Sequence, residues 1–316
     1  MKPYLLDLYT ASALDTYNLP AWIIRLYLSL FEPPLGKTLR LDLVNALLKQ
    51  HNYDLKGKRI LDVGCGIGDL SFIFAAQGAH VVGVELNGVK IEHAKDIARK
   101  WNFPEEHLTF VDGDVMTLEQ MDLGQFDAIF CLALLEHVQE DQLLLEQLHR
   151  MLRPGGFLML EVPSTTRKTI PEVEAEDGHV RTGYSFEEMP AFLAQFGFRV
   201  LAKRSMDSLG LTYQWCAASR ILPGHTARGP LFCILAPLFI PLIRLTTALV
   251  KRPGYELCFF ATREEEASKV PATPLPAALP DPETTSVLEE EESELLVVPV
   301  SAALPDHQKS SVLTEV

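Results

Sequence analysis

The chain of 316 residues has few of the features that mark secreted, zinc-binding or nucleic-acid-binding proteins. Its five cysteines, at positions 65, 131, 216, 233 and 258, include no Cys-x-x-Cys pair, so neither a zinc site nor a disulfide framework is indicated. Reduced thiols in the cytoplasm fit this spacing best. No cluster of Lys and Arg is interleaved with aromatic residues, which argues against a nucleic-acid partner.

Long apolar runs are also missing, and the N-terminus has no apolar core of a signal peptide. We therefore expect a cytoplasmic protein. The longest uncharged apolar stretch, Leu231 to Ile243, has thirteen residues, whereas a membrane-spanning helix needs about 20. Pro237 and Pro241 would further disturb a regular span. Two interpretations stay open for this stretch: a lid helix packed on the domain, or a peripheral helix on the cytoplasmic face of a membrane.

Negative charge is concentrated at the C-terminus. Residues 263–316 carry three Lys or Arg and twelve Asp or Glu, so they hold nine of the fourteen net negative charges. With seven prolines and no aromatic residue after position 263, this stretch is predicted to be a disordered tail. The tail repeats Ala277–Asp281 as Ala302–Asp306, which is either a duplicated docking motif for an unknown protein partner or a neutral duplication.

The order of apolar segments predicts an α/β fold. Residues 1–55 have helical periodicity in two stretches separated by Pro33-Pro34-Leu35-Gly36, which predicts an N-terminal helical cap. From residue 56 to 262, short apolar strands alternate with helices, which predicts a largely parallel sheet covered on both faces. The connection from 205 to 254 is unusually long and apolar, so it is expected to be a functional insertion or lid.

The predicted strands begin near residues 60, 79, 108, 126, 157, 198 and 255. A helix is expected to open at Ser185, where Ser185-Phe-Glu-Glu188 has capping-box spacing, and to end at Gly197.

A glycine-rich turn, Asp62-Val-Gly-Cys-Gly-Ile-Gly68, follows the first of these strands and opens a helix. That context is required of a nucleotide-binding turn, and a NAD-binding domain is the obvious rival interpretation. The NAD pattern places its third glycine three residues after the second, where this chain has Asp69. The carboxylate of Asp62 would repel a pyrophosphate but favour a ligand that carries a sulfonium and an amino group.

Two further acids follow the next two strands. Glu85 ends the second strand and can accept hydrogen bonds from both ribose hydroxyls, and Asp114 follows the third strand and can accept from an adenine amino group. A single acid at a strand end is usually only solvated. Three acids at successive strand ends beside a glycine turn favour a cofactor site instead.

At this point the sequence resembles the class I methyltransferases, over about residues 56–204 and the last strand. The resemblance implies S-adenosyl-L-methionine as cofactor and a seven-stranded Rossmann-like sheet in the order 3-2-1-4-5-7-6. The motifs Leu135–Val138, Leu152–Gly156 and Gly197–Phe198 are similar to those of the ubiquinone-biosynthesis-like branch. The cofactor-binding residues that it implies are Asp62, Gly64, Cys65, Gly66, Gly68, Glu85, Leu86, Asp114, Val115 and Cys131.

Two histidines are candidates for the base that would take a proton from an oxygen acceptor. His137 follows the fourth strand and could instead be a structural histidine of the next helix. His179 lies in a polar loop after the fifth strand and could instead be plain surface. No metal is predicted, because Glu136 and His137 are adjacent and should face different ways, and no second ligand pair is evident.

The apolar insertion and the N-terminal stretch Leu19–Tyr27 predict a small-molecule acceptor with an apolar part. A lipid, a quinone-like or polyketide-like ring, or a lipid-linked sugar would fit, with O-methylation as the reaction and possible membrane contact through residues 228–252. The rival hypotheses are N- or C-methylation of a small metabolite, and a non-catalytic methyltransferase-like scaffold that recruits partners through its acidic tail.

Overall fold

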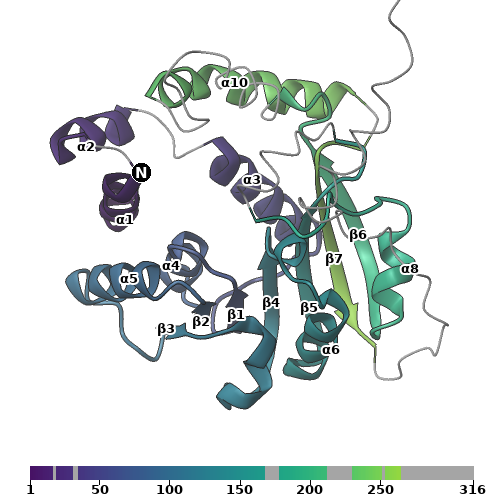
Figure 1. The fold of residues 1–316 in the computed structure, drawn as a ribbon. Helices are drawn as coiled ribbons and strands as arrows, with labels where there is room; N and C mark the ends of the chain where they lie inside the picture. Colours follow the sequence, from purple (N-terminus) through teal and green to yellow (C-terminus); the bar gives the residue numbers. More distant parts are fainter. Residues whose placement is uncertain (17–18, 31–34, 168–177, 212–229, 251–252, 265–316) are drawn as a thin grey trace, which may run out of the picture. The chain divides into compact units, whose positions relative to one another are not determined.

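Seven strands form one sheet in the computed structural model, which describes residues 1–16, 19–30, 35–167, 178–211, 230–250 and 253–264. They are β1 (Arg59–Val63), β2 (His80–Glu85), β3 (Leu108–Asp112), β4 (Phe126–Leu132), β5 (Leu152–Pro163), β6 (Phe198–Met206) and β7 (Glu256–Arg263). Their order is β3-β2-β1-β4-β5-β7-β6, and β7 is antiparallel to both of its neighbours. The predicted fold class and strand order are confirmed (Figure 1).

Alternate side chains of each strand enter two different cores. Ile60 of β1 packs in the core that lies under α1 (Pro3–Thr16), α4 (Asp69–Ala76) and α5 (Gly88–Lys100). Its neighbour Leu61 packs in the second core, under α6 (Asp141–Met151) and α8 (Met189–Ala194). Both faces of the sheet are therefore buried, which is why its strands read as nearly continuous apolar runs.

Two predicted elements begin several residues away from their expected starts. β5 begins at Leu152 instead of Phe157, because Leu152 pairs with Phe126 before the register shifts at the following glycine turn. The helix expected to open at Ser185 begins at Met189 as α8. Ser185 does accept a hydrogen bond from the Glu188 amide at 3.2 Å, but the intervening residues form turns.

The N-terminal residues form three helices where two were predicted. Besides α1, they are α2 (Ala21–Leu30) and α3 (Leu35–Gln50). α1 lies against α4 and α5, with the Tyr4 ring 5.9 Å from that of Phe72 and Asp7 in an ion pair with Lys100 at 2.7 Å. Its apolar residues are spread around the helix instead of forming one stripe, so its position depends on long-range contacts that helical periodicity does not reveal.

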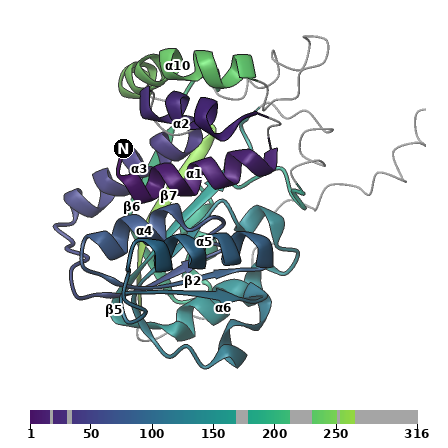
Figure 2. The same cartoon turned by 90° about the vertical axis from the view of Figure 1, so that its left-hand side faces the viewer.

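The long insertion contributes α10 (Pro230–Leu249), which lies on α3 and β6 (Figure 2). Ile240 and Ile243 are buried there with Leu39 and Met206. Arg244 forms an ion pair with Asp42 at 2.7 Å, which ties α10 to α3. Among the helices of the described residues, none is both long enough and apolar enough to span a membrane. The predicted tail beyond residue 264 lies outside the described residues.

Candidate active site

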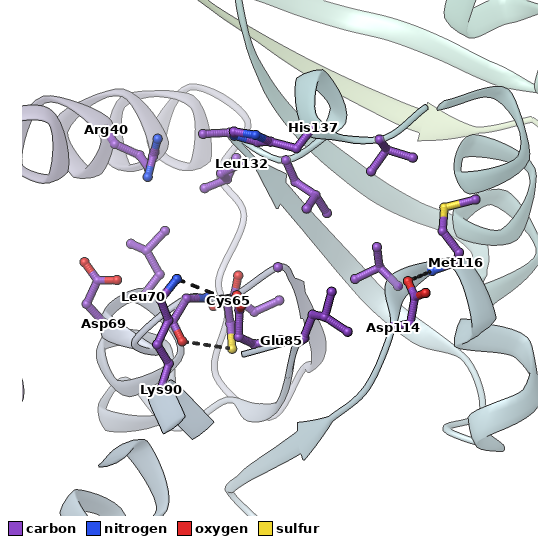
Figure 3. Close-up of a pocket in the computed structure, with 18 of the residues that line it drawn as sticks. Arg40, Cys65, Asp69, Leu70, Glu85, Lys90, Asp114, Met116, Leu132 and His137 are labelled. Carbon is purple, nitrogen blue, oxygen red and sulfur yellow. Dashed lines mark hydrogen bonds and ion pairs between the residues drawn. The ribbon is translucent and has the colours of Figure 1, made fainter. Parts of the chain in front are cut away.

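A cavity of about 750 Å³ opens at the carboxyl ends of β1, β2 and β4 (Figure 3). That volume suits a ligand of nucleotide size. The residues that line it are Lys37, Arg40, Asp62, Gly64, Cys65, Gly66, Asp69, Leu70, Glu85, Leu86, Lys90, Asp114, Val115, Met116, Leu132, Ala133, Leu134, His137, Val138, Gln139, Glu140 and Leu143. Eight of the ten predicted cofactor residues are among them.

The other two predicted cofactor residues have different places. Cys131 is fully buried in the core between the sheet and α6, because its side chain points away from the cavity face of β4. Gly68 ends the glycine turn without lining the cavity. Its φ is 81°, and a Cβ there would come within 2.6 Å of the Phe110 ring, so Gly68 permits the close packing of turn and sheet.

Gly66 has the opposite surroundings. Its φ is 59°, and a Cβ added to it would meet nothing within 4 Å. Since Gly66 lines the cavity, the turn exposes bare backbone to the space that a ligand would fill. The Gly66 amide donates to the Glu85 carboxylate at 2.9 Å, and the Asn87 amide donates to the other oxygen of Glu85 at 3.0 Å. Glu85 thereby holds the glycine turn in place beside β2.

Asp62 lies at the floor of the cavity and is only 4 % exposed. It accepts a hydrogen bond from the Ser71 hydroxyl at 2.6 Å. Burial raises the pKa of Asp62 to about 6 against the smaller effect of this hydrogen bond. A cationic group in the cavity would favour the ionised carboxylate, so the site gains from a positively charged ligand.

A third acid, Asp69, was not predicted as a site residue. Burial alone would raise its pKa, but Lys37 and Arg40 of α3 and the Tyr9 hydroxyl of α1 outweigh that effect and hold the pKa below its usual value. Lys37 lies 3.0 Å from the Asp69 carboxylate, and Tyr9 donates to it at 3.0 Å. The N-terminal helices thus cover one end of the cavity.

Arg40 lines the same end of the cavity and is paired with Glu161 of β5. The spacing of Lys37 and Arg40, three residues apart on one helix, is the signal that could have marked them. That spacing shows that the two side chains share a helix face, but the sequence does not show that this face of α3 meets the cavity.

The two predicted histidines lie next to each other, although they are 42 positions apart in the chain. His137 is in η2 (Leu135–His137) and lines the cavity opposite Glu85, as Figure 3 shows. The ring of His179 meets that of His137 edge to face, with centroids 4.7 Å apart. Nδ1 of His137 lies 3.1 Å from the Gly178 carbonyl oxygen, and Nη2 of Arg167 donates to Nδ1 of His179 at 2.9 Å.

The loop that carries His179 is fastened to the segment that carries His137. The Val180 amide donates to the Glu136 carbonyl at 2.9 Å. Arg181 forms a buried ion pair with Asp141 at 2.8 Å and donates to the carbonyls of Val138 and Gln139. These contacts join the loops that follow β4 and β5. The sheet alone would not set the relative position of the two rings.

Glu136 is 3 % exposed, and burial raises its pKa to about 7. A carboxylate oxygen of Glu136, a ring nitrogen of His137 and a ring nitrogen of His179 all lie within 4.8 Å of one another. The expectation that the adjacent Glu136 and His137 face different ways is therefore wrong in its geometry, and His179 supplies a third possible ligand atom. However, the Arg167 guanidinium at His179 would repel a cation, so the arrangement does not favour a metal.

The cavity suits S-adenosylmethionine. Gly66 leaves the backbone open to it, Glu85 is placed at the end of β2 where ribose hydroxyls would lie, and Asp62 and Asp69 offer negative charge to an amino group and a sulfonium. Asp114 caps η1 (Val115–Met121) by accepting from the Met116 amide at 2.9 Å, beside Val115 on the cavity wall.

Comparison with known proteins agrees with this interpretation. Residues 54–197 match the family described as methyltransferase domain. The chain is 38% identical over 128 residues to a ubiquinone biosynthesis O-methyltransferase of Coxiella burnetii, which covers 40% of this chain and 53% of that protein. It is 34% identical over 115 residues to the protein of that name from Psychrobacter arcticus, covering 36% and 44%. The chain thus spans about half the length of the curated relatives it matches.

Among solved structures, a putative sarcosine dimethylglycine methyltransferase from Galdieria sulphuraria has a TM-score of 0.51 and 11% sequence identity. The match covers 71% of this chain and 84% of that one. At this identity the likeness concerns the fold.

Proposed function

We propose that this protein is an S-adenosylmethionine-dependent enzyme that O-methylates a partly apolar small molecule, because residues 54–197 match the methyltransferase domain and resemble ubiquinone biosynthesis O-methyltransferases. The observation that carries the proposal is that one cavity is lined by the glycine turn and its acids on one side and by His137, a candidate base, on the opposite side. The acceptor class is inferred from the apolar helices described below.

The donor end is built from the glycine turn and its acids. S-adenosylmethionine, when bound, supplies a methyl group on a positively charged sulfur. Glu85 holds the ribose, Asp114 and Val115 the adenine, and Asp62 the positive charge near the turn. Leu86, which is 68 % exposed in the structure, covers the adenine face. Lys37 and Arg40 supply positive charge at the far end, where a carboxylate of the donor would lie.

The acceptor oxygen must lose a proton when it takes the methyl group, and a neutral imidazole near pH 7 can accept that proton. His137 and His179 are the groups assigned to this chemistry. The other task is alignment of oxygen, methyl carbon and sulfur, which binding in one rigid cavity provides. His137 lies 3.9 Å from a Glu136 carboxylate oxygen, so Glu136 in its ionised form would stabilise the imidazolium that forms.

The acceptor is assigned an apolar part because exposed apolar side chains gather on α2 and α10. Trp22, Leu26 and Leu30 of α2 are 67 %, 53 % and 68 % exposed. Leu245 and Leu249 of α10 are 55 % and 70 % exposed. Single exposed leucines are ordinary, but runs of them at helical spacing on two helices favour contact with an apolar partner. We infer that this surface rests on the cytoplasmic face of a membrane that holds the acceptor.

Liposome sedimentation tests the membrane contact. The wild-type chain should sediment with vesicles that contain anionic lipid, and a Trp22→Ser/Leu26→Ser/Leu249→Ser variant should stay in the supernatant. Equal partition of both proteins would contradict the contact. The acidic tail is assigned no role in catalysis, and an unknown protein partner for it is kept as a proposal from its repeated motif.

The acceptor itself is found by labelling. Cell extracts are incubated with the full chain and a donor that carries a deuterated methyl group, and mass spectrometry shows which molecule gains the label. A labelled hydroxyl of a partly apolar small molecule is expected. A labelled nitrogen or carbon, or a labelled protein, would contradict the proposal. Activity should survive EDTA, because no metal is assigned, and a loss that magnesium restores would overturn that assignment.

A further inference from the structure

The hydrogen-bond partners of His137 and His179 place the two rings in opposite tautomers. The Gly178 carbonyl oxygen can only accept, so Nδ1 of His137, 3.1 Å away, carries the proton. The Arg167 guanidinium can only donate, so Nδ1 of His179, 2.9 Å away, carries the lone pair. In the neutral state, Nε2 of His137 therefore has the lone pair, and Nε2 of His179 has the proton.

These opposite tautomers are suited to opposite tasks. Resting on the function proposed above, we propose that His137 is the base that takes the acceptor proton and that His179 donates a hydrogen bond to the same acceptor oxygen. Arg167 is the positioning residue that gives His179 this role. A nitrogen of one ring lies within 4.8 Å of a nitrogen of the other, and a single oxygen can hydrogen-bond to two nitrogens at about that separation. We take these nitrogens to be the two Nε2 atoms.

Arg167 also makes His179 unsuited to be the base. Protonation of His179 would put a proton on Nδ1, which faces the guanidinium, and would place two positive charges side by side. Arg167 is held in place from its other side, because its Nε donates to the Thr182 carbonyl at 3.3 Å. His137 lies instead 3.9 Å from a Glu136 carboxylate oxygen, and an ionised carboxylate there would favour a protonated ring.

The proposed reaction transfers a methyl group to the acceptor oxygen and a proton away from it. The acceptor oxygen forms a bond to the methyl carbon of the sulfonium donor, the carbon–sulfur bond breaks, and its electron pair stays on sulfur. The oxygen gives its proton to Nε2 of His137, which later releases it to solvent. The hydrogen bond from His179 stabilises the negative charge that develops on the oxygen.

The charged groups around the two rings come from several elements. Glu136 of η2 and Arg167 of the loop after β5 face the rings directly. The Arg181–Asp141 ion pair fastens the His179 loop. Behind Glu136 lie Glu161 and Arg40, which act on its ionisation through their charges.

Nitrogen-15 NMR of the histidine rings tests the assignment without an acceptor. The full chain, labelled at histidine nitrogens and saturated with S-adenosylhomocysteine, should show His137 protonated at Nδ1 and His179 protonated at Nε2. His137→Gln and His179→Gln variants assign the signals. Arg167→Met should turn His179 into a mixture of both tautomers, and Arg167→Lys, which keeps a donor, should restore the single one. Two rings in the same tautomer, or no response to Arg167→Met, would overturn the proposal.

Turnover in the extract, measured as deuterated product per unit time, separates the two roles. His137→Gln should lower the rate by about 100-fold or more, which is the usual size of a lost general base. His179→Ala should lower the rate by about tenfold, and His179→Gln, which keeps an N–H donor, should recover part of that loss. Equal losses for the two glutamine variants would contradict the division of roles. An extract without any labelled product would contradict the proposed function, whereas the NMR result would stand.

Discussion

The proposed donor half and the proposed acceptor half of the site are built in different ways. The donor half uses residues that follow three neighbouring strands, β1, β2 and β3, and the backbone itself provides much of the contact surface. The acceptor half uses two loops after β4 and β5 that hold each other through Arg181, together with helices from both ends of the described chain. Short local segments define the first half, and long-range contacts define the second.

The comparison teaches that the two halves should fail independently. A change in the glycine turn should abolish donor binding and leave the histidine pair intact. A change in the Arg181 contacts should move the histidines and leave donor binding intact. Four sets of variants test this separation.

Gly66→Ala should weaken donor binding by on the order of 100-fold, because the new methyl group enters the space in which the ligand meets the backbone. Gly57→Ala is the matched control. Gly57 also has a positive φ, 69°, and open space at its Cβ, but it does not line the cavity. Both variants should lose about 1–2 kcal/mol of unfolding free energy from backbone strain. Isothermal titration with S-adenosylhomocysteine should separate them, and equal affinities would contradict the site.

Arg181→Lys should lower turnover by about tenfold while donor affinity stays unchanged. An ammonium can keep the ion pair with Asp141, but it cannot reproduce the planar fork that also reaches the Val138 and Gln139 carbonyls. Arg153→Lys is the control, because Arg153 pairs with Asp127 at the opposite end of the strands. Product formation in the extract and titration with S-adenosylhomocysteine give the two readouts. A parallel loss of donor affinity would show that the halves are coupled.

The same contrast explains what the sequence could predict. The strand order and the donor site followed from a glycine turn and from Asp62, Glu85 and Asp114, because parallel strands bring their carboxyl ends to one edge. Cys131 was misplaced because a one-residue difference along a strand exchanges the two faces of the sheet.

For the proposed acceptor half, the sequence offered individual candidate residues but not their contact with one another. His137 and His179 were recognised by residue type, but their contact depends on Arg181, Asp141 and the Val180 amide, and no periodicity links those positions. Lys37 of α3 was not predicted for the same reason: its ion pair with Asp69 joins two helices, and the sequence of one helix does not show which residues lie opposite it.

Thr247→Val should loosen α10 without touching the donor half. The Thr247 hydroxyl accepts from the Asp207 amide at 3.1 Å, and Asp207 is 2 % exposed with a φ of 55°. Removing the acceptor takes this hydrogen bond away from a buried amide, which costs about 1–3 kcal/mol. Hydrogen exchange should rise in α10 and near Asp207 and stay unchanged in β1 and the glycine turn. Thr246→Val, which removes only a bond to Ile243 within the helix, should have a smaller effect.

Glu136→Gln should stabilise the protein at pH 8 and have little effect at pH 5. Burial raises the pKa of Glu136 to about 7, above the value of about 4.5 in an unfolded chain, and Glu161 acts in the same direction. The folded state therefore binds the proton more tightly, and stability falls as pH rises from the unfolded pKa through the folded one.

Glutamine removes that loss because it stays neutral, although it also gives up the attraction of Arg40 and Arg167. The expected gain in Tm is about 2–4 °C at pH 8, which corresponds to about 1 kcal/mol in a domain of this size. Glu119→Gln is the control, because its pairing with Arg150 lowers the pKa of Glu119 and the variant should gain nothing at pH 8. A gain in Tm of equal size at pH 5 and pH 8 would contradict the raised pKa of Glu136 in the folded protein.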